Sequence, residues 1–368
     1  MSRKLSYDRV IFGSAMLILV VGLVMIYSAS AMIAAQKIGS DNPYYFLVRQ
    51  CIWAVGGAGL MLIMMHLDAN RLKSPAIVYT MMGGLIAALV IVLFQAPING
   101  THRWIILPMF QLQPSEFAKP VIILFLASQL ALKEEKINDL SSVVLPIGGV
   151  LAIVAGLILL QPDFGTAAVI LAVSASMFFV AGVAWKRILL FSAVLVPAAF
   201  LLIFTAEYRR ARLLSFLNPE ADPLGSGFQA MQSLIALGTG GVTGLGIGNG
   251  RQKLFFLPEP HTDFIFSIIG EELGFIGAFG LLLVFGLLVF RGLRVARNSR
   301  DRFAFYAALG FTLLIGLQVL INVSVALCLL PTKGLPLPLV SYGGSSLLTS
   351  MIAVGILLNL SQYSHQPN

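Results

Sequence analysis

The chain has 368 residues, of which 58% are hydrophobic and 11% are charged, and its mean hydropathy is +0.91. Soluble domains carry about a quarter charged residues, so this composition excludes a soluble globular protein and indicates a polytopic membrane protein. The net charge of +8 does not point to nucleic acid as a partner, because basic residues in so apolar a chain follow the positive-inside rule and contact anionic lipid.

The cysteines and histidines give no sign of a metal site. Cys51 and Cys328 lie in or beside apolar runs and have no metal-type spacing, which favours buried structural thiols. The four histidines are scattered and form no zinc signature.

Apolar runs of about 20 residues predict ten membrane-spanning helices. They lie at 10–35, 50–66, 75–95, 115–132, 142–161, 164–184, 188–206, 264–290, 303–327 and 343–361. The first run is too long for a cleaved signal peptide, so we interpret it as an uncleaved helix. We expect an all-α polytopic membrane protein with a single domain over residues 1–368 and a long periplasmic loop, 207–262, between helices 7 and 8.

The basic residues predict the orientation of these helices. An even number of spans places both termini on one side, and the short loops on that side hold most of the lysines and arginines. The positive-inside rule then makes the termini cytoplasmic. The loops at about 36–49, 96–113, 207–262 and 328–342 are predicted to be periplasmic.

The first polar feature on the outer side is Asn99-Gly-Thr-His-Arg-Trp104, followed by Gln113-Pro-Ser-Glu-Phe-Ala-Lys119. Pro114 suits the first turn of a helix, and Glu116 and Lys119 are three residues apart on one helical face, where they can pair. A charged pair this close to hydrocarbon usually faces a polar cavity. The alternative is an ion pair that only holds the helix end.

A second feature, Gln161-Pro-Asp-Phe-Gly-Thr166, forms a tight break between two spans. Asp163 is either a functional carboxylate or simply the cap of the next helix. The third is the loop 207–262, which is longer than a connection needs. It has an apolar stretch at 228–237, long enough to lie on or dip into the membrane. A glycine run at 238–250 fails the dinucleotide and phosphate-loop spacings, so its predicted role is conformational.

The fourth feature begins at Asn322 and continues as Pro331-Thr-Lys-Gly-Leu-Pro-Leu-Pro-Leu-Val-Ser-Tyr-Gly-Gly-Ser-Ser346. Proline and glycine break the helix at membrane depth, which is tolerated where the backbone lines a cavity. Lys333 there needs an anionic partner, and Ser341-Tyr-Gly-Gly lies close by. An ordinary kinked hairpin is the alternative.

A junction at Glu259–Asp263 joins the long loop to the apolar run that starts at Phe264. An ionisable group at a membrane boundary is costly without partners and tends to carry function, although Asp263 could merely cap the helix. Within the run, Gly270 and Gly274 allow close helix packing. The neighbouring Glu271 or Glu272 must then find a polar partner in the bundle.

Together these motifs resemble the SEDS family (shape, elongation, division and sporulation), and the resemblance covers the whole chain. It is carried by His102-Arg-Trp104, Gln113-Pro-Ser-Glu116 with Lys119, Gln161-Pro-Asp-Phe-Gly-Thr166, Pro258-Glu-x-x-Thr-Asp263-Phe, Gly270-Glu-Glu-Leu-Gly274 and Ser341-Tyr-Gly-Gly344-Ser-Ser. The stretch 330–347 is most similar to the division branch, and the elongation branch comes second. His261 lies in a variable part of its motif and receives no family role.

The resemblance implies a peptidoglycan glycosyltransferase that polymerises lipid II at the outer face of the bacterial inner membrane, at the division septum. It implies Asp263 as the catalytic carboxylate. From the polar outer-side motifs themselves we expect a substrate-binding set of Arg103, Glu116, Lys119, Asp163, Lys333 and Ser341. The implied protein partners are a class B penicillin-binding transpeptidase (FtsI-like) and FtsQ-, FtsL- and FtsB-like proteins of the division machinery.

The residue types fit this chemistry. A sugar hydroxyl is a poor nucleophile, so a carboxylate such as Asp263 serves as general base. The departing lipid diphosphate needs positive charge or a metal. The outer-side cations are Arg103, Lys119, Lys333 and the arginines at 209, 210 and 212. Glu116 and Asp163 could orient these cations or hold a divalent cation such as Mg²⁺ or Mn²⁺, so no cofactor is assigned with certainty. A single displacement would invert the anomeric centre.

Three alternatives stay open from the sequence. A lipid II flippase would need a polar path through the full membrane depth and inverted repeats, and only Glu271 and Glu272 favour such a path. A non-catalytic scaffold would explain the spans but not the polar outer motifs. An elongation-type polymerase would share the chemistry of the division type.

Overall fold

The computed structural model describes residues 6–37, 42–97, 101–106, 110–187, 227–254, 256–331 and 334–364, together with a few positions between 189 and 197. Its elements are α1 (Arg9–Lys37), α2 (Tyr45–His66), α3 (Ala69–Leu72), α4 (Pro75–Leu93), β1 (Ile105–Ile106), β2 (Gln111–Leu112), α5 (Pro114–Leu132), η1 (Glu134–Lys136), η2 (Leu140–Val144), α6 (Leu145–Leu160), α7 (Phe164–Val180), α10 (Phe228–Gly240), α11 (Ile265–Asn298), α12 (Arg302–Ala326) and α13 (Gly344–Ser361). The two short strands form an antiparallel pair, with Ile105 opposite Leu112.

Membrane-spanning helices dominate the described part of the chain. Eight helices there are long and apolar enough to cross a membrane, and α7 is a shorter apolar helix. They coincide with nine of the predicted spans to within a few residues, except that α2 starts earlier and α11 continues past residue 290 to Asn298. The remaining predicted span, 188–206, lies almost wholly outside the described residues. The fold is that of an all-α, multi-pass membrane protein, as predicted.

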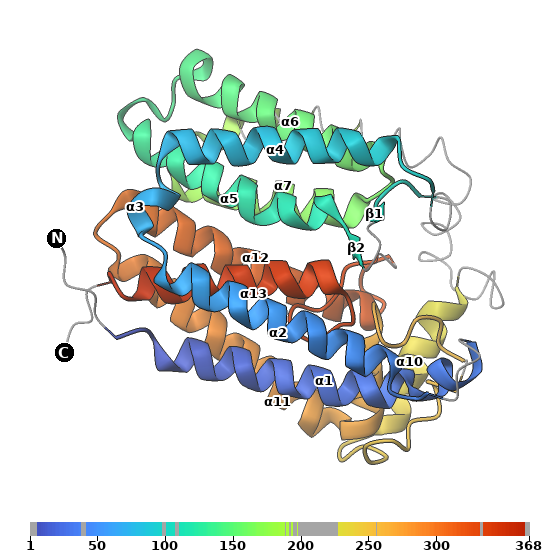
Figure 1. Ribbon diagram of the computed structural model, residues 1–368. Coiled ribbons are helices and arrows are strands. Elements are labelled where there is room, and N and C mark those ends of the chain that lie inside the picture. Colours follow the sequence, from blue (N-terminus) through green and yellow to red (C-terminus); the bar gives the residue numbers. More distant parts are fainter. Residues whose placement is uncertain are drawn as a thin grey trace.

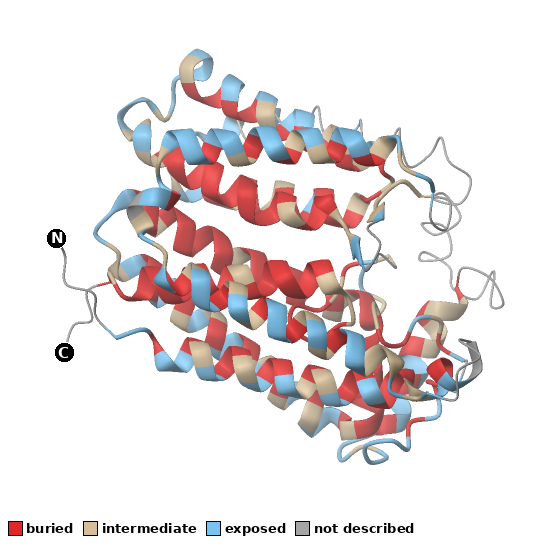
Figure 2. Ribbon diagram, viewed as in Figure 1, coloured by how far each residue is buried: buried red, intermediate tan, exposed pale blue. Residues whose placement is uncertain are grey.

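The core of the bundle is formed by α5, α12 and α13. In Figure 1, α4 to α7 form one group and α1, α2 and α11 another, and α12 and α13 lie between them. Burial follows this arrangement. In the most apolar 18-residue stretch of each helix, 89% of the residues of α13 and 83% of those of α5 are buried, compared with 22% of those of α2. Figure 2 shows the exposed positions gathered on outer helices such as α4. In a membrane these exposed apolar faces contact lipid.

A polar contact ties the two ends of the described chain together. The backbone N–H of Asp8, just before α1, donates to the hydroxyl of Ser361 at the end of α13 (3.0 Å). The carboxylate of Asp8 pairs with Arg291 of α11 at 2.6 Å. The start of α1 and the end of α13 therefore lie at the same end of the bundle, and β1, β2 and α10 lie at the opposite end (Figure 1).

Helix α11 is broken at Gly274, whose φ of 67° and ψ of −169° are not helical. We expected this glycine only to allow close packing within a continuous helix. Instead, the helix is interrupted, and the glycine-rich loop after α10 (residues 241–253) supplies backbone hydrogen-bond partners at the break. The N–H groups of Phe275 and Ile276 donate to the carbonyls of Gly241 (2.9 Å) and Val242 (3.1 Å).

The same loop also bonds to the helix on the other side of the break. The carbonyls of Glu271 and Glu272 accept hydrogen bonds from the N–H groups of Leu245 (3.0 Å) and Gly246 (2.9 Å). A broken helix needs such partners, because unsatisfied backbone groups are costly in a bilayer. Gly244 is required here, since its φ is +81° and a Cβ atom would lie 2.2 Å from the Glu272 carbonyl oxygen. The predicted conformational role of the glycine run is confirmed.

Candidate active site

Asp263 lies in the turn that leads into α11, at the end of the bundle that carries β1, β2 and α10 (Figure 1). The N-cap of α11 is Phe264, which makes no side-chain cap bond, so Asp263 does not occupy the capping position. Its side chain is directed at the backbone of Gly334, where an added Cβ atom would lie 3.2 Å from a carboxylate oxygen. Asp263 is partly exposed, so its carboxylate combines a fixed neighbour with access from outside.

Two side chains from other segments hold this turn. Asn322 of α12 donates from Nδ2 to the carbonyl of Asp263 at 3.1 Å. Ser341 donates from its hydroxyl to the carbonyl of Thr262 at 2.6 Å and accepts the N–H of Leu337 at 2.8 Å. The predicted Ser341 therefore lies in the site, 3% exposed, with its hydroxyl engaged by the protein backbone.

The predicted pair of Glu116 and Lys119 forms on the first turns of α5. Lys119 Nζ lies 2.7 Å from Glu116 Oε1, and the two side chains are 1% and 3% exposed. The second carboxylate oxygen of Glu116 accepts a bond from the hydroxyl of Thr349 on α13 (3.3 Å). Pro114 opens the helix as predicted. The pair is enclosed between α5 and α13.

Asp163 caps α7 and also binds α5. One carboxylate oxygen accepts the N–H of Thr166 at 3.2 Å, so the capping alternative is correct. The other oxygen accepts bonds from the Ser115 hydroxyl (2.8 Å) and from Gln113 Nε2 (3.1 Å). Asp163 therefore does more than cap a helix, because it joins the break between α6 and α7 to the start of α5.

Arg103, just before β1, reaches the same break. Its Nε donates to the carbonyl of Gln161 at 2.9 Å, and its Nη2 donates to the carbonyl of Pro162. Both acceptors are uncharged backbone carbonyls. Arg103 is also only partly buried. Of the two predicted cations within the described residues, Lys119 is paired with Glu116 at 2.7 Å, whereas Arg103 donates to neutral carbonyls.

The segment 334–343 connects the Asp263 turn to the group around Asp163. A Cβ atom on Gly165 would lie 2.7 Å from Cγ of Leu335, so Leu335 packs directly on the first turn of α7. The carbonyl of Leu335 accepts a 2.8 Å bond from Asn322, which also binds the Asp263 carbonyl. The Asp263 turn is therefore linked to the polar group around Asp163 through the amide of Asn322 and the apolar packing of Leu335 on Gly165.

Known proteins resemble this chain in sequence and in fold. The family model described as a cell cycle protein and named for FtsW, RodA and SpoVE matches residues 8–366. The chain belongs to the FtsW/RodA/SpoVE family.

Individual relatives of this FtsW/RodA/SpoVE protein match along nearly their full lengths. A probable peptidoglycan glycosyltransferase FtsW from Geobacter metallireducens is 42% identical over 357 residues, which covers 96% of this chain and 94% of the relative. Stage V sporulation protein E from Bacillus subtilis is 40% identical over 364 residues, which covers 99% of this chain and 99% of the relative.

Solved structures of related proteins share the fold. A chain from a structure described as "Structural coordination of polymerization and crosslinking by a peptidoglycan synthase complex" has a TM-score of 0.77 and 31% identity, covering 97% of this chain and 98% of that chain. The rod shape determining protein RodA from Thermus thermophilus has a TM-score of 0.71 and 29% identity, covering 99% of both chains.

Several predicted cations of this FtsW/RodA/SpoVE protein lie outside the described residues. These are Lys333 and the arginines at 209, 210 and 212. Their assignment to substrate binding stays a prediction. In the described ranges, the cations near Asp163 and Glu116 are Arg103 and Lys119.

The carboxylates do not form a metal centre within the described ranges. No group there brings together three or more His, Cys, Asp or Glu side chains that could hold a metal ion. Glu116 is committed to Lys119 and Thr349, and Asp163 accepts three bonds from protein donors. This donor set does not fit a protein-only site for Mg²⁺, which prefers octahedral oxygen ligands.

Glu271 and Glu272 bind the glycine-rich loop rather than line a path through the bundle. Glu271 accepts the N–H groups of Arg251 (2.7 Å) and Gln252 (3.1 Å). Glu272 pairs with Lys253 at 2.6 Å and accepts a 2.7 Å bond from Ser28 of α1. Both carboxylates are 1% exposed. The expected polar neighbours are therefore present, and they come from residues 251–253 and from α1.

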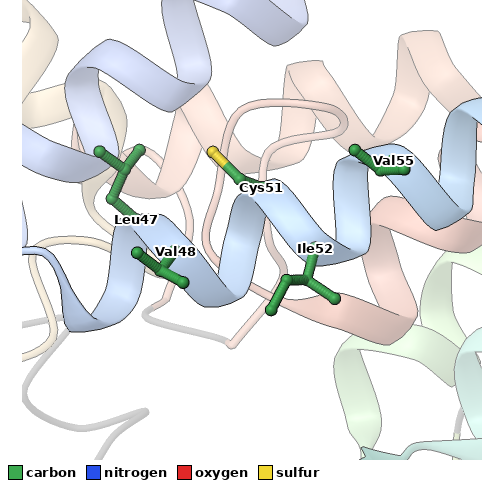
Figure 3. Close-up of a pocket in the computed structure, with 5 residues that line it drawn as sticks. All are labelled: Leu47, Val48, Cys51, Ile52 and Val55. Carbon is green, nitrogen blue, oxygen red and sulfur yellow. The ribbon is translucent and has the colours of Figure 1, made fainter.

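A pocket of about 420 Å³ lies on the outward face of α2, lined by Leu47, Val48, Cys51, Ile52 and Val55. Figure 3 shows these apolar side chains along one helix. The lining contains no charged group that could act on a sugar or a diphosphate. Its chemistry suits a lipid chain, so this pocket is not a candidate active site.

The sequence interpretation missed three polar residues of the site. Asn322 was noted only as the start of a motif, Gln113 only as part of one, and Thr349 not at all. Each binds a predicted site residue or its backbone. The signal that could have found Asn322 is its amide within the long apolar run of α12, since a polar group inside a membrane helix needs a partner.

Proposed function

We propose that this chain is a peptidoglycan glycosyltransferase that polymerises lipid II, with Asp263 as the general base. The single observation that carries the proposal is the Asp263 carboxylate, partly exposed at the outer end of the bundle in a turn held from two sides. Relatives at 42% and 43% identity are named probable peptidoglycan glycosyltransferase FtsW, which supports the same reaction here.

The reaction forms one bond and breaks one. The 4-hydroxyl oxygen of one sugar attacks the anomeric carbon of another, and the bond from that carbon to the lipid diphosphate breaks. The hydroxyl proton passes to Asp263, because a carboxylate within hydrogen-bond reach can act as general base. Undecaprenyl diphosphate leaves with its electron pair, and the anomeric centre inverts.

Arg103 is the described residue best suited to the diphosphate. Among the residues that the structure describes, its guanidinium donates to the neutral carbonyls of Gln161 and Pro162, whereas the Lys119 charge is neutralised by Glu116 at 2.7 Å and is enclosed. A bidentate guanidinium also matches phosphate geometry. We therefore assign Lys119 to holding the start of α5. Lys333 remains a second proposed cation, and a divalent cation carried in with the diphosphate remains a proposal without a defined site.

The test is Asp263→Asn, assayed for glycan chains from labelled lipid II with the purified protein. The amide is nearly isosteric but cannot take the proton, and loss of a general base alone lowers the rate by about 10²–10⁴-fold. Asp301→Asn is the matched control, because that carboxylate lies at the opposite end and is 53% exposed, 3.7 Å from Lys73. Polymerisation by a folded Asp263→Asn protein close to that of the control would remove Asp263 from the catalytic role.

The same assay separates the alternative functions. A flippase would show no polymerisation even in the unaltered protein, and a scaffold would tolerate Asp263→Asn. From the sequence, Glu271 and Glu272 favoured a polar path through the membrane for a flippase. In the structure, Glu271 accepts backbone hydrogen bonds from the loop and Glu272 pairs with Lys253. This arrangement supports the polymerase over the flippase.

The cellular setting is also part of the proposal. We place the protein in the bacterial inner membrane at the division septum, with both termini cytoplasmic, in complex with an FtsI-like class B transpeptidase and FtsQ-, FtsL- and FtsB-like proteins. The similarity to a chain of a peptidoglycan synthase complex supports a transpeptidase partner, and the FtsW relatives favour division over elongation. Co-purification with the transpeptidase is expected to raise polymerase activity at matched lipid and detergent. Equal activity without it would contradict the partnership.

A further inference from the structure

We propose that Asn322 is a positioning residue for the reaction, which acts by fixing the backbone that carries the Asp263 carboxylate. The inference rests on the proposed function of Asp263 as general base. Asn322 lies on α12, far in sequence from the turn it holds, and is 1% exposed. It touches the backbone of the catalytic turn and not the reacting atoms.

The amide of Asn322 uses both of its hydrogens on two separate segments. Nδ2 donates to the carbonyl of Asp263 at 3.1 Å and to the carbonyl of Leu335 at 2.8 Å. Two carbonyl acceptors on one nitrogen fix which end of the amide is Nδ2. The bond to Leu335 anchors Asn322 in turn, since Leu335 packs against Gly165 at the start of α7.

Ser341 provides a second hold on the neighbouring peptide. Its hydroxyl donates to the carbonyl of Thr262 at 2.6 Å. Ser341 is itself fixed, because its carbonyl accepts a 3.2 Å bond from Gln50 of α2. The carbonyls of Thr262 and Asp263 belong to the two peptide groups that flank the Asp263 Cα atom.

Holding both flanking peptides fixes the direction of the Asp263 side chain. The orientations of those peptide planes set φ and ψ at Asp263, and hence the direction of its Cα–Cβ bond. A general base must lie about 2.6–3.2 Å from the atom that gives up its proton. A displacement of about 1 Å can cost on the order of 100-fold in rate. Loss of either hydrogen bond, from Asn322 or from Ser341, should therefore lower the turnover number and leave substrate binding largely intact.

Asn322→Leu removes the hold while keeping a side chain of similar size. The chain offers a close control in Asn359 of α13, which is also buried. Its Nδ2 lies within hydrogen-bond distance of three backbone carbonyls at the opposite end of the bundle, those of Met64 (2.8 Å), Met65 (3.1 Å) and Leu67 (2.5 Å). In both asparagines the Oδ1 atom finds no hydrogen-bond partner within the described ranges. Asn359→Leu therefore reproduces the loss of a buried amide without touching the Asp263 turn.

The experiment measures kcat and KM for lipid II together with thermal stability, for both variants in complex with the transpeptidase. We expect Asn322→Leu to lower kcat by about 10–100-fold with KM within about twofold, and to lower Tm by about as much as Asn359→Leu. Asn359→Leu is expected to keep kcat within about twofold per folded protein. Equal kcat in the two variants, or a loss seen in KM alone, would overturn the inference.

Two further variants keep the result interpretable. Ser341→Ala loosens the same turn from the other side and is expected to give the same kcat loss, which decides the case if Asn322→Leu does not fold. Because the two holds act on one turn, Asn322→Leu and Ser341→Ala should be non-additive in kcat, whereas Asn359→Leu and Ser341→Ala should add.

Asp263→Asn, measured in parallel, separates the two proposals. If Asp263→Asn polymerises normally, the proposed function fails and the positioning role fails with it. If Asp263→Asn is inactive and Asn322→Leu behaves like Asn359→Leu, only the positioning role is wrong.

Discussion

Replacing Glu116 with glutamine should destabilise the protein far more than an ordinary charge removal. Glu116→Gln leaves the Lys119 ammonium without its counter-charge, in a place where the two side chains are 3% and 1% exposed and 2.7 Å apart. Removing one partner of such a buried pair typically costs about 3–5 kcal/mol, because the remaining charge is uncompensated. The Thr349 hydroxyl, 3.3 Å from the carboxylate, can still donate to the amide oxygen, so the loss comes mainly from the charge.

The chain contains a control pair of similar length but different burial. Arg302 and Glu134 lie 2.9 Å apart, with side chains 61% and 40% exposed. Exposed pairs contribute about 0–1 kcal/mol, so Glu134→Gln should have little effect. Replacing both members of the buried pair, Glu116→Gln with Lys119→Met, should recover part of the loss, since no lone charge then remains.

Equilibrium unfolding of the purified protein in a fixed detergent measures these differences directly. Glu116→Gln should lower the unfolding free energy by several times the change in Glu134→Gln and should reduce both folded yield and polymerisation. If Glu116→Gln and Glu134→Gln unfold alike, the pair is hydrated in solution and the reasoning from burial is refuted.

Three other changes test separate parts of the structure. Gly274→Ala should strongly destabilise the contact between α11 and the loop after α10, because φ at Gly274 is +67° and the new Cβ atom would lie 2.3 Å from the nitrogen of Gly244. A Cβ atom at Gly280 on the same helix would meet nothing within 4 Å, so Gly280→Ala should be neutral or slightly stabilising. Equal thermal stability of the two variants would contradict the helix break. Lys253→Met leaves Glu272 without its 2.6 Å partner and should increase amide hydrogen exchange in residues 241–253, whereas unchanged exchange would mean that the ion pair does not hold the loop. For the orientation, an impermeant thiol reagent applied to intact spheroplasts should label a cysteine at Ala221 and not one at Ser299; the reverse labelling would invert the predicted topology.

The spans were predictable because their signal is local. A run of about 20 apolar residues is enough to identify a membrane helix, and Pro114 at the first turn of α5 marked its start correctly. The pair of Glu116 and Lys119 was predictable for the same reason, since helical geometry alone brings residues three apart together.

The remaining features depend on contacts between distant segments. The sequence around Gly274 does not predict that residues 241–246 insert into a break in α11. That contact is made by four backbone hydrogen bonds from another part of the chain. Likewise, Asn322 shows as a polar residue in an apolar helix, but its partners at Asp263 and Leu335 are set by how α12 packs. The capping of α7 by Asp163 was foreseen as one of two alternatives, while its bonds to Ser115 and Gln113 required the tertiary fold.

The repair of the broken α11 has a practical consequence for spectroscopy. The joint is made by backbone atoms, and the side chains of Val242 and Ile247 beside it are 64% and 58% exposed. A small fluorophore attached through a cysteine at either position would lie next to the contact between the loop and α11 and would leave its backbone hydrogen bonds in place. Undocking of the loop from the helix during a catalytic cycle would then become visible as a change in the emission of a single dye.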